Sequence, residues 1–163
     1  MGNMLANDIR TQYDRTFATL RGIVEDFPDD KWLVIHGEDD FYIPSRIAYH
    51  LASYLDRHMT EGFKDKEFDL KCPFGEWRKG DATTLPDKKA FLAYYDEVLA
   101  RAREKLASLD DESLSAPMEP ERTYWGACQL GVHLAMMREY SAHCGELNKI
   151  RIEYGLPDVW VSR

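Results

Sequence analysis

Two side chains that can bind a metal, Glu139 and His143, lie four residues apart in the segment REYSAHCGEL. Residues with this spacing on a helix have Cβ atoms about 5–6 Å apart, so both could contact a single ion. His50, in the separate segment IAYHLASYLD, is the third candidate ligand. Two imidazoles and one carboxylate suit Zn²⁺, and equally Fe²⁺, Ni²⁺ or Mn²⁺. Three protein ligands leave coordination positions open, as catalytic metal sites do.

All three residues occupy positions where a helix is expected to carry apolar side chains. The inward pattern of the last long segment, with steps of three and four, is Val132, Met136, Glu139, His143, Leu147 and Ile150. In the earlier segment, His50 falls on the same kind of stripe, between Ile47 and Tyr54. An ionised carboxylate in an apolar interior loses several kcal/mol of solvation unless a partner compensates. A metal ion held by the three side chains would supply that compensation.

The same residues could instead form a buried polar network. His50 taken alone is more typical of a hydrogen-bonded core histidine than of a metal ligand. Glu139 could form an ordinary ion pair with His143. Arg138 and Arg46 are other candidate partners for this carboxylate, and Glu-x-x-x-His spacing is common on helices by chance. Spacing alone therefore leaves both interpretations open.

Other reactive side chains have simpler interpretations. His133 lies beside the inward stripe and is expected to be structural, while His36 and His58 are expected to face solvent. Cys144 follows His143 directly, which turns it about 100° around the helix and predicts a packed thiol. Tyr54 is an inward candidate one turn from His50, but no residue can be assigned as a general base.

The elements that would position these side chains are helices. Apolar residues recur every three or four positions in four segments, with predicted bounds of 5–27, 44–63, 86–109 and 124–154. Pro44 and Pro86 suit the first turn of a helix, and Gly155 followed by Pro157 suits a helix end. The tail beyond is expected to fold Trp160 back onto the other helices.

The connection between the second and third predicted helices is unusually long. It has about twenty residues, where antiparallel neighbours in a bundle use about 2–8. A link of that length can travel along the whole bundle, so the two helices could run parallel. We therefore predict an all-α fold, a four-helix bundle with a long crossover between helices two and three. The CPFGEW segment of this link could cover the metal site or merely connect the helices.

Composition restricts the classes of partner. The 163 residues carry a net charge of −8 without a dense basic run, so we expect no nucleic-acid partner. The cysteines, Cys72, Cys128 and Cys144, lack CxxC spacing and are expected to be reduced thiols. No apolar run approaches the ~20 residues that cross a bilayer, and the first residues lack the pattern of a signal peptide. We expect one cytoplasmic domain over residues 1–163 with no membrane partner.

Several segments together resemble the DinB/YfiT-like superfamily of metal-binding four-helix bundles over nearly the whole chain. They are FPDDKW, IAYHLASYLD, LPDKKAFLAYYDEVLARAREKLASLDDESL and MMREYSAHCGELNKIRIEYGLP. The resemblance implies one His ligand from helix two and an HxxxH pair from helix four, with a Gly two residues after the last ligand. His50 matches the first ligand, and His143 with Gly145 matches the last. Glu139 stands where the family pattern has its middle histidine.

The resulting His-Glu-His set is similar to that of the mycothiol-dependent maleylpyruvate isomerases of this superfamily. Those enzymes carry an additional C-terminal domain, for which we expect no counterpart here. The resemblance implies a divalent metal, with Zn or Ni favoured over Fe or Mn. It also implies a low-molecular-weight thiol, a small-molecule substrate and a homodimer. The function it implies is a metal-dependent enzyme that activates a thiol or water, as a thiol S-transferase, an isomerase or a small-molecule hydrolase. The alternative is a non-catalytic, stress-associated bundle that binds metal. Catalytic residues are left unassigned.

Overall fold

The computed structural model describes residues 3–60, 64–78 and 82–161, and this part of the chain is helical. Its long helices are α1 (Met4–Glu25), α2 (Pro44–Met59), α4 (Lys88–Ala107) and α6 (Leu130–Glu153). Two short α-helices, α3 (Phe68–Lys71) and α5 (Asp111–Ser115), and two 3₁₀ turns, η1 (Asp40–Tyr42) and η3 (Pro120–Trp125), lie in the connections. Over these residues there is no β-strand, only an isolated bridge between Pro117 and Cys128. The all-α prediction is confirmed.

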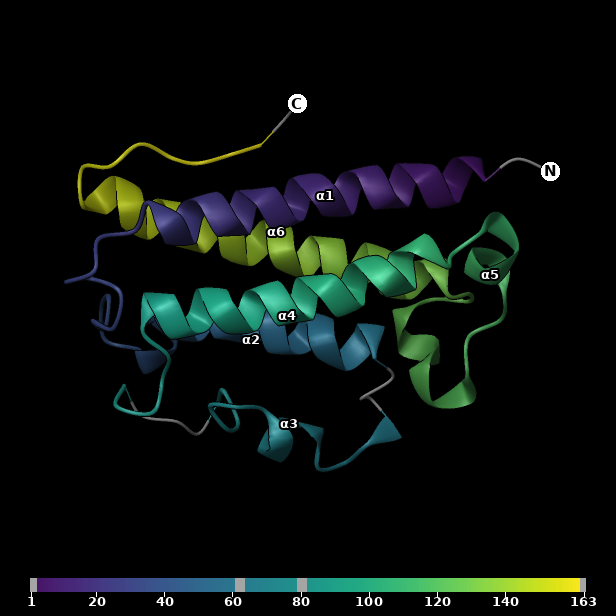
Figure 1. Ribbon diagram of the computed structural model, residues 1–163, viewed down its shortest axis with the longest axis horizontal. Helices are drawn as coiled ribbons and strands as arrows, with labels where there is room; N and C mark the ends of the chain where they lie inside the picture. The colour runs from purple at the N-terminus through teal and green to yellow at the C-terminus, as the bar shows by residue number, and fades with distance from the viewer. Residues whose placement is uncertain (1–2, 61–63, 79–81, 162–163) are drawn as a thin grey trace.

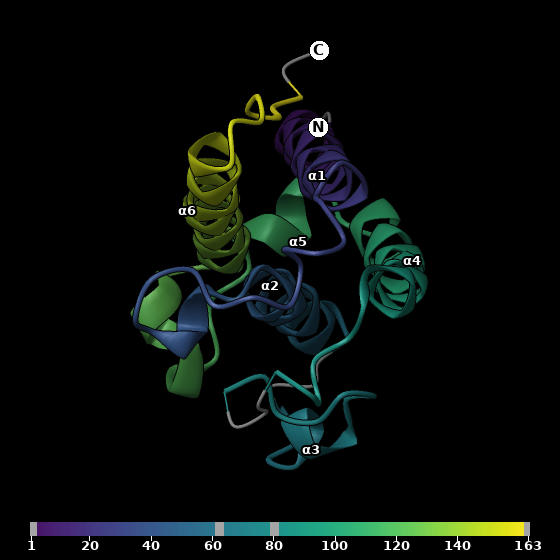
Figure 2. The same ribbon diagram turned by 90° about the vertical axis from the view of Figure 1, so that its left-hand side faces the viewer.

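The four long helices lie side by side around a common interior (Figures 1 and 2). Helix α1 packs against α4 and α6, and α2 packs against the same two helices, so α1 and α2 occupy opposite corners (Figure 2). Figure 1 shows α2 and α4 running in the same direction, opposite to α1 and α6. The segment that joins α2 to α4 carries α3 and passes outside the four helices (Figure 2).

Apolar spacing explains why these segments are helical and which face they bury. On α1 the residues at steps of three and four are buried: Ile9, Tyr13, Phe17, Leu20 and Val24. Burial of one side chain of this size contributes about 1.5–3 kcal/mol before the entropy of ordering it is counted. Phe17 meets Tyr140 of α6 edge to face, with ring centroids 6.1 Å apart. The core therefore lies between the long helices and is rich in aromatic rings.

The predicted helix starts are correct for α2 and wrong for α4 and α6. Pro44 occupies the first turn of α2. Helix α4 begins at Lys88, after Pro86, because the Asp87 side chain caps it by accepting a hydrogen bond from the backbone N–H of Ala90. Helix α2 ends at Met59, and the end predicted near 63 falls in 61–63, outside the described residues.

Helix α6 begins at Leu130 and not near 124, because the preceding residues form the 3₁₀ turn η3. Gly126 then adopts a φ of +152°, a conformation that suits glycine. A Cβ at Gly131 would lie 2.6 Å from the carbonyl oxygen of Trp125, so η3 and the start of α6 approach each other closely. This turn brings Trp125 and its neighbours beside α2.

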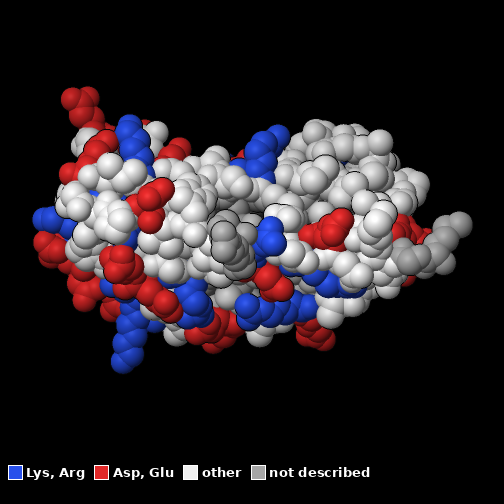
Figure 3. Space-filling view, turned by 90° about the horizontal axis from the view of Figure 1, so that it is seen from above, with Lys and Arg blue, Asp and Glu red and all other residues white. Residues whose placement is uncertain are grey.

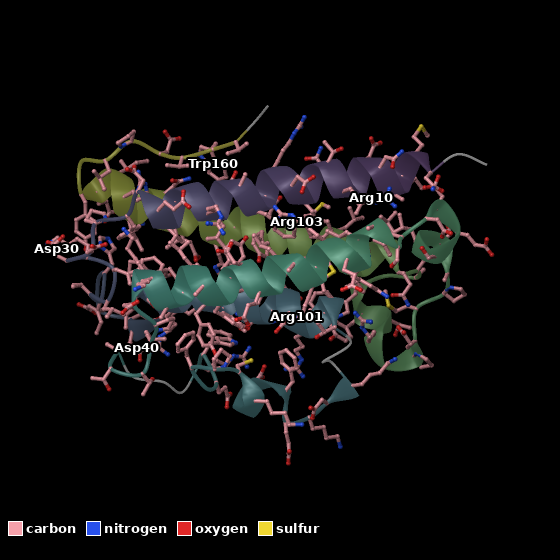
Figure 4. The ribbon with its side chains drawn as sticks, in the orientation of Figure 1. Arg10, Asp30, Asp40, Arg101, Arg103 and Trp160 are labelled. Carbon is pink, nitrogen blue, oxygen red and sulfur yellow. The ribbon has the colours of Figure 1, made fainter. Side chains whose placement is uncertain are left out.

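The C-terminal segment folds back along α1 (Figures 1 and 4). The buried Arg151 donates to the carbonyl oxygen of Pro157, 3.0 Å away, and Asn148 exchanges two hydrogen bonds with the backbone of Val159. Val159 packs on the core, whereas Trp160 is 52% exposed. The tail therefore lies back on the helices as predicted, with Val159 packed on the core and Trp160, half exposed, lining a pocket beside α1.

The remaining surface carries mixed charge. On the face seen in Figure 3, Lys and Arg side chains are interspersed with Asp and Glu.

The end of α4 is capped by an arginine of α1. Arg10, labelled in Figure 4, donates to the carbonyl oxygens of Leu106, Ala107 and Leu109. Among the described helices, none combines the length and the apolar character needed to cross a membrane.

Candidate metal centre

His50, Glu139 and His143 come together at the junction of α2 and α6. One potential ligand atom from each lies within 4.8 Å of the others, close enough for one ion to contact all three. The Nε2 of His143 is 3.6 Å from Oε2 of Glu139. The His50 and His143 rings meet edge to face with centroids 5.0 Å apart. Side chains from two helices far apart in the sequence thus form one cluster.

The expected position of Glu139 and His143 in the core stripe is wrong by one residue. The stripe of α6 that packs inward passes through Met136, Tyr140, Cys144 and Leu147. The Glu139 and His143 side chains sit at its edge and retain 30% and 14% of their exposure. His50 alone is buried in the manner expected. The carboxylate therefore lines an open space, and water already meets part of its solvation cost.

Glu146 holds the His143 ring in place. The Nδ1 of His143 lies 2.7 Å from Oε2 of Glu146, and because a carboxylate accepts, this nitrogen donates. A neutral His143 then has its lone pair on Nε2, the nitrogen that faces Glu139. Metal-binding histidines usually donate their other ring nitrogen to such a carboxylate, which fixes the ring and raises its basicity. Glu146 is not among the site residues predicted from the sequence, although a carboxylate three residues after a helical His is a usable signal.

His50 is kept neutral by its surroundings. Burial lowers its pKa to about 3, with the nearby charges of His143 and Arg78 acting in the same direction. A neutral imidazole is the form that binds a metal. The Nδ1 of His50 is buried and has no hydrogen-bond partner in the described structure. A buried polar atom in that state is costly for a purely structural histidine.

Aromatic side chains from two connections enclose the cluster. The Trp77 ring lies over His50, with centroids 4.1 Å apart, and Phe41 of η1 lies 5.6 Å from the ring of His143. Arg46 donates to the carbonyl oxygen of Trp77 at 2.8 Å, and Tyr49 donates to that of Gly75 at 2.6 Å. The CPFGEW segment therefore covers the site, and side chains of α2 hold the segment there by donating to its backbone carbonyl oxygens.

The cluster opens into a cavity of about 870 Å³. The cavity runs from the three candidate ligands, past Tyr54, to Trp125 and Arg122 of η3. His58 lines it too and packs edge to face with Trp125 at 5.8 Å, so the expectation that His58 faces solvent is wrong. His58 lies eight positions after His50, which puts both on one face of α2. A small organic molecule of ordinary size fits a space of this volume.

Comparison with known protein families identifies the family to which the chain belongs. The sequence profile of the DinB superfamily matches residues 12–145. This chain belongs to the DinB superfamily. All three candidate ligands lie inside the matched region, which also covers α2, α4 and most of α6. No curated protein sequence and no solved structure gives a significant match.

The donor set of this DinB-superfamily chain fits a divalent ion. Two ligand atoms at tetrahedral positions around Zn²⁺, with bonds of about 2.1 Å, are separated by roughly 3.4 Å. The distance of 3.6 Å between His143 and Glu139 is near that value. His50 approaches from the facing helix, so the three donors converge from two directions. Small side-chain adjustments would bring all three into ligand range.

Three other side chains considered as candidates lie outside the cluster of His50, Glu139 and His143: His133, Cys144 and His36. His133 receives a hydrogen bond from, or donates one to, the hydroxyl of Tyr13 at 3.0 Å, in agreement with the predicted structural role. Cys144 is a buried thiol, as predicted, and burial raises its pKa to about 12. It lines a separate pocket of about 270 Å³ beside α1. His36 is half-buried against Tyr154 and pairs with Glu153, so it does not face solvent freely.

Proposed function

We propose that this protein is a metal-dependent enzyme in which His50, Glu139 and His143 hold a divalent cation that activates a thiol or a water molecule. The carrying observation is that the three donors converge at one end of an open cavity of about 870 Å³. Here the cluster faces space of substrate size.

The bound cation would lower the pKa of a thiol or water and so supply a nucleophile at neutral pH. The chain's own residues supply position and enclosure. Glu146 orients His143, and Trp77 packs on His50 and limits access of water from one side. Tyr54 faces the cavity one turn from His50, and burial raises its pKa well above the ordinary value. It therefore stays a phenol at neutral pH and can donate a hydrogen bond to a substrate, but it does not act as a base.

We further propose that the fold is the four-helix bundle with a long crossover between α2 and α4 and that the ligand order is the His-Glu-His variant. The parallel direction of those two helices and the donor set support both statements. The resemblance favours Zn²⁺ or Ni²⁺ as the ion, a thiol S-transfer, isomerisation or hydrolysis as the reaction, and a homodimer as the assembly. Light scattering on the purified chain tests the dimer, and a monomeric mass would contradict it.

Metal analysis tests the site. Protein purified without a histidine tag should contain, or take up on addition of Zn²⁺ or Ni²⁺, one equivalent of metal as measured by mass spectrometry of the acid-digested sample. Absence of metal from both the purified and the supplemented protein would eliminate the proposal. The buried polar network would then be the better description of the three residues.

A reaction screen separates an enzyme from a metal-binding bundle without turnover. The metal-loaded protein is incubated with electrophilic aromatic acceptors and mycothiol, bacillithiol, glutathione or coenzyme A, and separately with model esters and amides. Metal-dependent conjugation or hydrolysis is expected, with loss of rate on chelation. Stoichiometric metal without any such reaction would favour the non-catalytic alternative.

A further inference from the structure

The cavity has a second charged end that the metal site does not use. His50, Tyr54 and His58 follow each other at intervals of four residues along α2 and all line the cavity. At about 1.5 Å per residue, His58 lies roughly 12 Å along the helix from His50. Arg122 of η3 meets His58 there, with Nη2 at 3.2 Å from Nδ1. The cavity therefore joins the three candidate metal ligands to a buried arginine.

Cationic side chains gather at this second end of the cavity. Arg57 pairs with Asp69 at 2.9 Å, and Arg122 lies 3.6 Å from Glu119. Lys64 also lines the cavity. Hydrogen bonds from its own backbone and from Gln129 lower the pKa of Glu119, and Arg122 and Lys64 act in the same direction. Three cationic side chains, Arg57, Lys64 and Arg122, thus line this end in a chain whose net charge is −8. An anion entering this end would meet a favourable local charge.

Arg122 is positioned as a binding group inside the protein. It is only 7% exposed, so a charged hydrogen bond to it is screened less than one at the surface. Burial and the charges of Arg122 and Arg57 lower the pKa of His58 to about 4, so His58 is neutral at pH 7. A neutral His58 can accept from Arg122 and fix its direction without adding charge.

Flat aromatic surfaces line the path between the two ends. The Tyr54 ring lies 5.8 Å from His50, 4.5 Å from His58 and 6.1 Å from Trp125. Tyr124 packs on Trp125 at 4.7 Å and also lines the cavity. Rings at such spacings favour planar, apolar ligands. The middle of the cavity is apolar and its far end is cationic.

We propose that the far end of the cavity is an anion-binding subsite, centred on Arg122 with Lys64, for an acid that has an aromatic or planar conjugated body. The acid group lies at Arg122, and the body lies against the rings of Tyr54 and Trp125 where they line the cavity. The opposite end of the same molecule reaches toward His50, Glu139 and His143. Only this last placement rests on the proposed function. The competing explanation is that Arg122 merely ties η3 to α2.

Matched probes test the subsite. Cinnamate and its neutral amide, cinnamamide, have the same planar body and differ in charge, and their binding to metal-free protein can be followed by quenching of tryptophan fluorescence. Charged hydrogen bonds contribute about 1.5–3 kcal/mol, so cinnamate should bind roughly tenfold or more tightly. Equal affinity of the acid and the amide for the wild-type protein would overturn the proposal.

Arginine and lysine variants locate the subsite. Arg122→Gln should remove the preference for the acid, and Lys64→Gln should reduce it while disturbing the fold less. Arg103→Gln is the control, because Arg103 is an exposed residue of α4 outside the cavity. Circular dichroism reports folding, and Lys64→Gln decides the test if Arg122→Gln does not fold. A preference that survives in every folded variant of Arg122 and Lys64, or that Arg103→Gln also removes, would overturn the subsite.

A bifunctional probe keeps this test separate from that of the metal site. The compound 3-(4-sulfanylphenyl)propanoate carries a thiol at one end and a carboxylate at the other. Its preference over the corresponding amide reports the Arg122 end and is expected with or without Zn²⁺. Its gain in affinity on addition of Zn²⁺ reports the three ligands. If the gain is missing but the preference remains, the proposed function fails and the anion subsite stands; the reverse result removes the subsite alone.

Discussion

Two histidines of this protein are buried to the same extent and differ in what their nitrogens meet. His50 and His133 are each 8% exposed, and burial lowers the pKa of both, to about 3 and about 4. His133 has the hydroxyl of Tyr13 at hydrogen-bond distance from its Nδ1. The Nδ1 of His50 has no partner in the described structure, and its ring faces the cavity. Burial and a neutral charge therefore do not distinguish a ligand from a core residue, whereas the partner does.

The largest expected difference between the two histidines is in metal binding. His143→Ala or His50→Ala should weaken the binding of Zn²⁺ by at least about a hundredfold, because a two-ligand site loses chelation. His133→Ala should leave metal affinity within about threefold of wild type, since its ring is held by Tyr13. Calorimetric titration measures the affinities, and circular dichroism checks that the helices persist. Equal loss in all three variants would break the comparison.

Glu146 gives the next largest effect. Glu146→Gln replaces the carboxylate that receives the Nδ1–H of His143, and loss of such a partner typically costs about 10–100-fold in metal affinity. Glu153→Gln is a matched control, because Glu153 is a carboxylate of the same helix that pairs with His36 far from the cluster. Competition with a chelating dye measures both variants. Unchanged affinity in Glu146→Gln would mean that the 2.7 Å contact does not orient the ring.

The pH dependence of the free energy of unfolding tests the buried, neutral state of His133. Its pKa is about 4 in the folded protein against the ordinary 6.5, so between these values the unfolded chain binds a proton that the folded chain does not. This residue therefore lowers stability as pH falls from about 6.5 toward 4, by up to ~1.4 kcal/mol per pH unit, and has no effect above that range.

His133→Gln cannot take up this proton and should show a shallower loss of stability over the same range. Urea unfolding of metal-free protein at several pH values between about 7 and 4.5 measures the slopes, about one proton apart. Parallel slopes for wild type and variant would contradict the buried, neutral state of His133.

The smallest expected effect comes from a change at Tyr13, the hydrogen-bond partner of His133. Tyr13→Phe removes the hydroxyl that meets Nδ1 of His133 and should lower the free energy of unfolding by about 1 kcal/mol. Metal affinity should not change. Tyr42→Phe is the control, because Tyr42 is an exposed tyrosine. A change in Zn²⁺ affinity in Tyr13→Phe would show that the two histidines are coupled.

Apolar periodicity predicts the long helices, and single residues mark some of their ends. Pro44 starts α2 and Gly155 follows α6, as expected from their backbone preferences. The predicted start of α6 near 124 is too early, since 124–129 continue the apolar pattern although Gly126 breaks the helix. The pattern reports which residues are apolar, whereas the helix boundary depends on backbone angles and on a close contact at Gly131.

The cluster of three candidate ligands can be anticipated from the sequence, and the CPFGEW segment stands out as a candidate cover, but the contacts that surround the cluster cannot be anticipated. His50, Glu139 and His143 stand out as polar residues in apolar stripes, although Glu139 and His143 lie at the edge of the stripe. Trp77 and Arg122 reach the cavity from connections whose path no periodicity describes. The sequence positions of these two residues do not indicate that they lie close to α2. Only the folded chain reveals that they share one cavity.

The covering loop is attached to α2 through backbone atoms. Arg46 and Tyr49 hold carbonyl oxygens of Trp77 and Gly75, and a carbonyl is present whatever side chain the residue bears. Substitutions in this loop can therefore exchange the groups that overhang the cavity while its tether to the helix persists. The groups that face the cavity from this loop can thus change without loss of the contacts that hold the loop on α2.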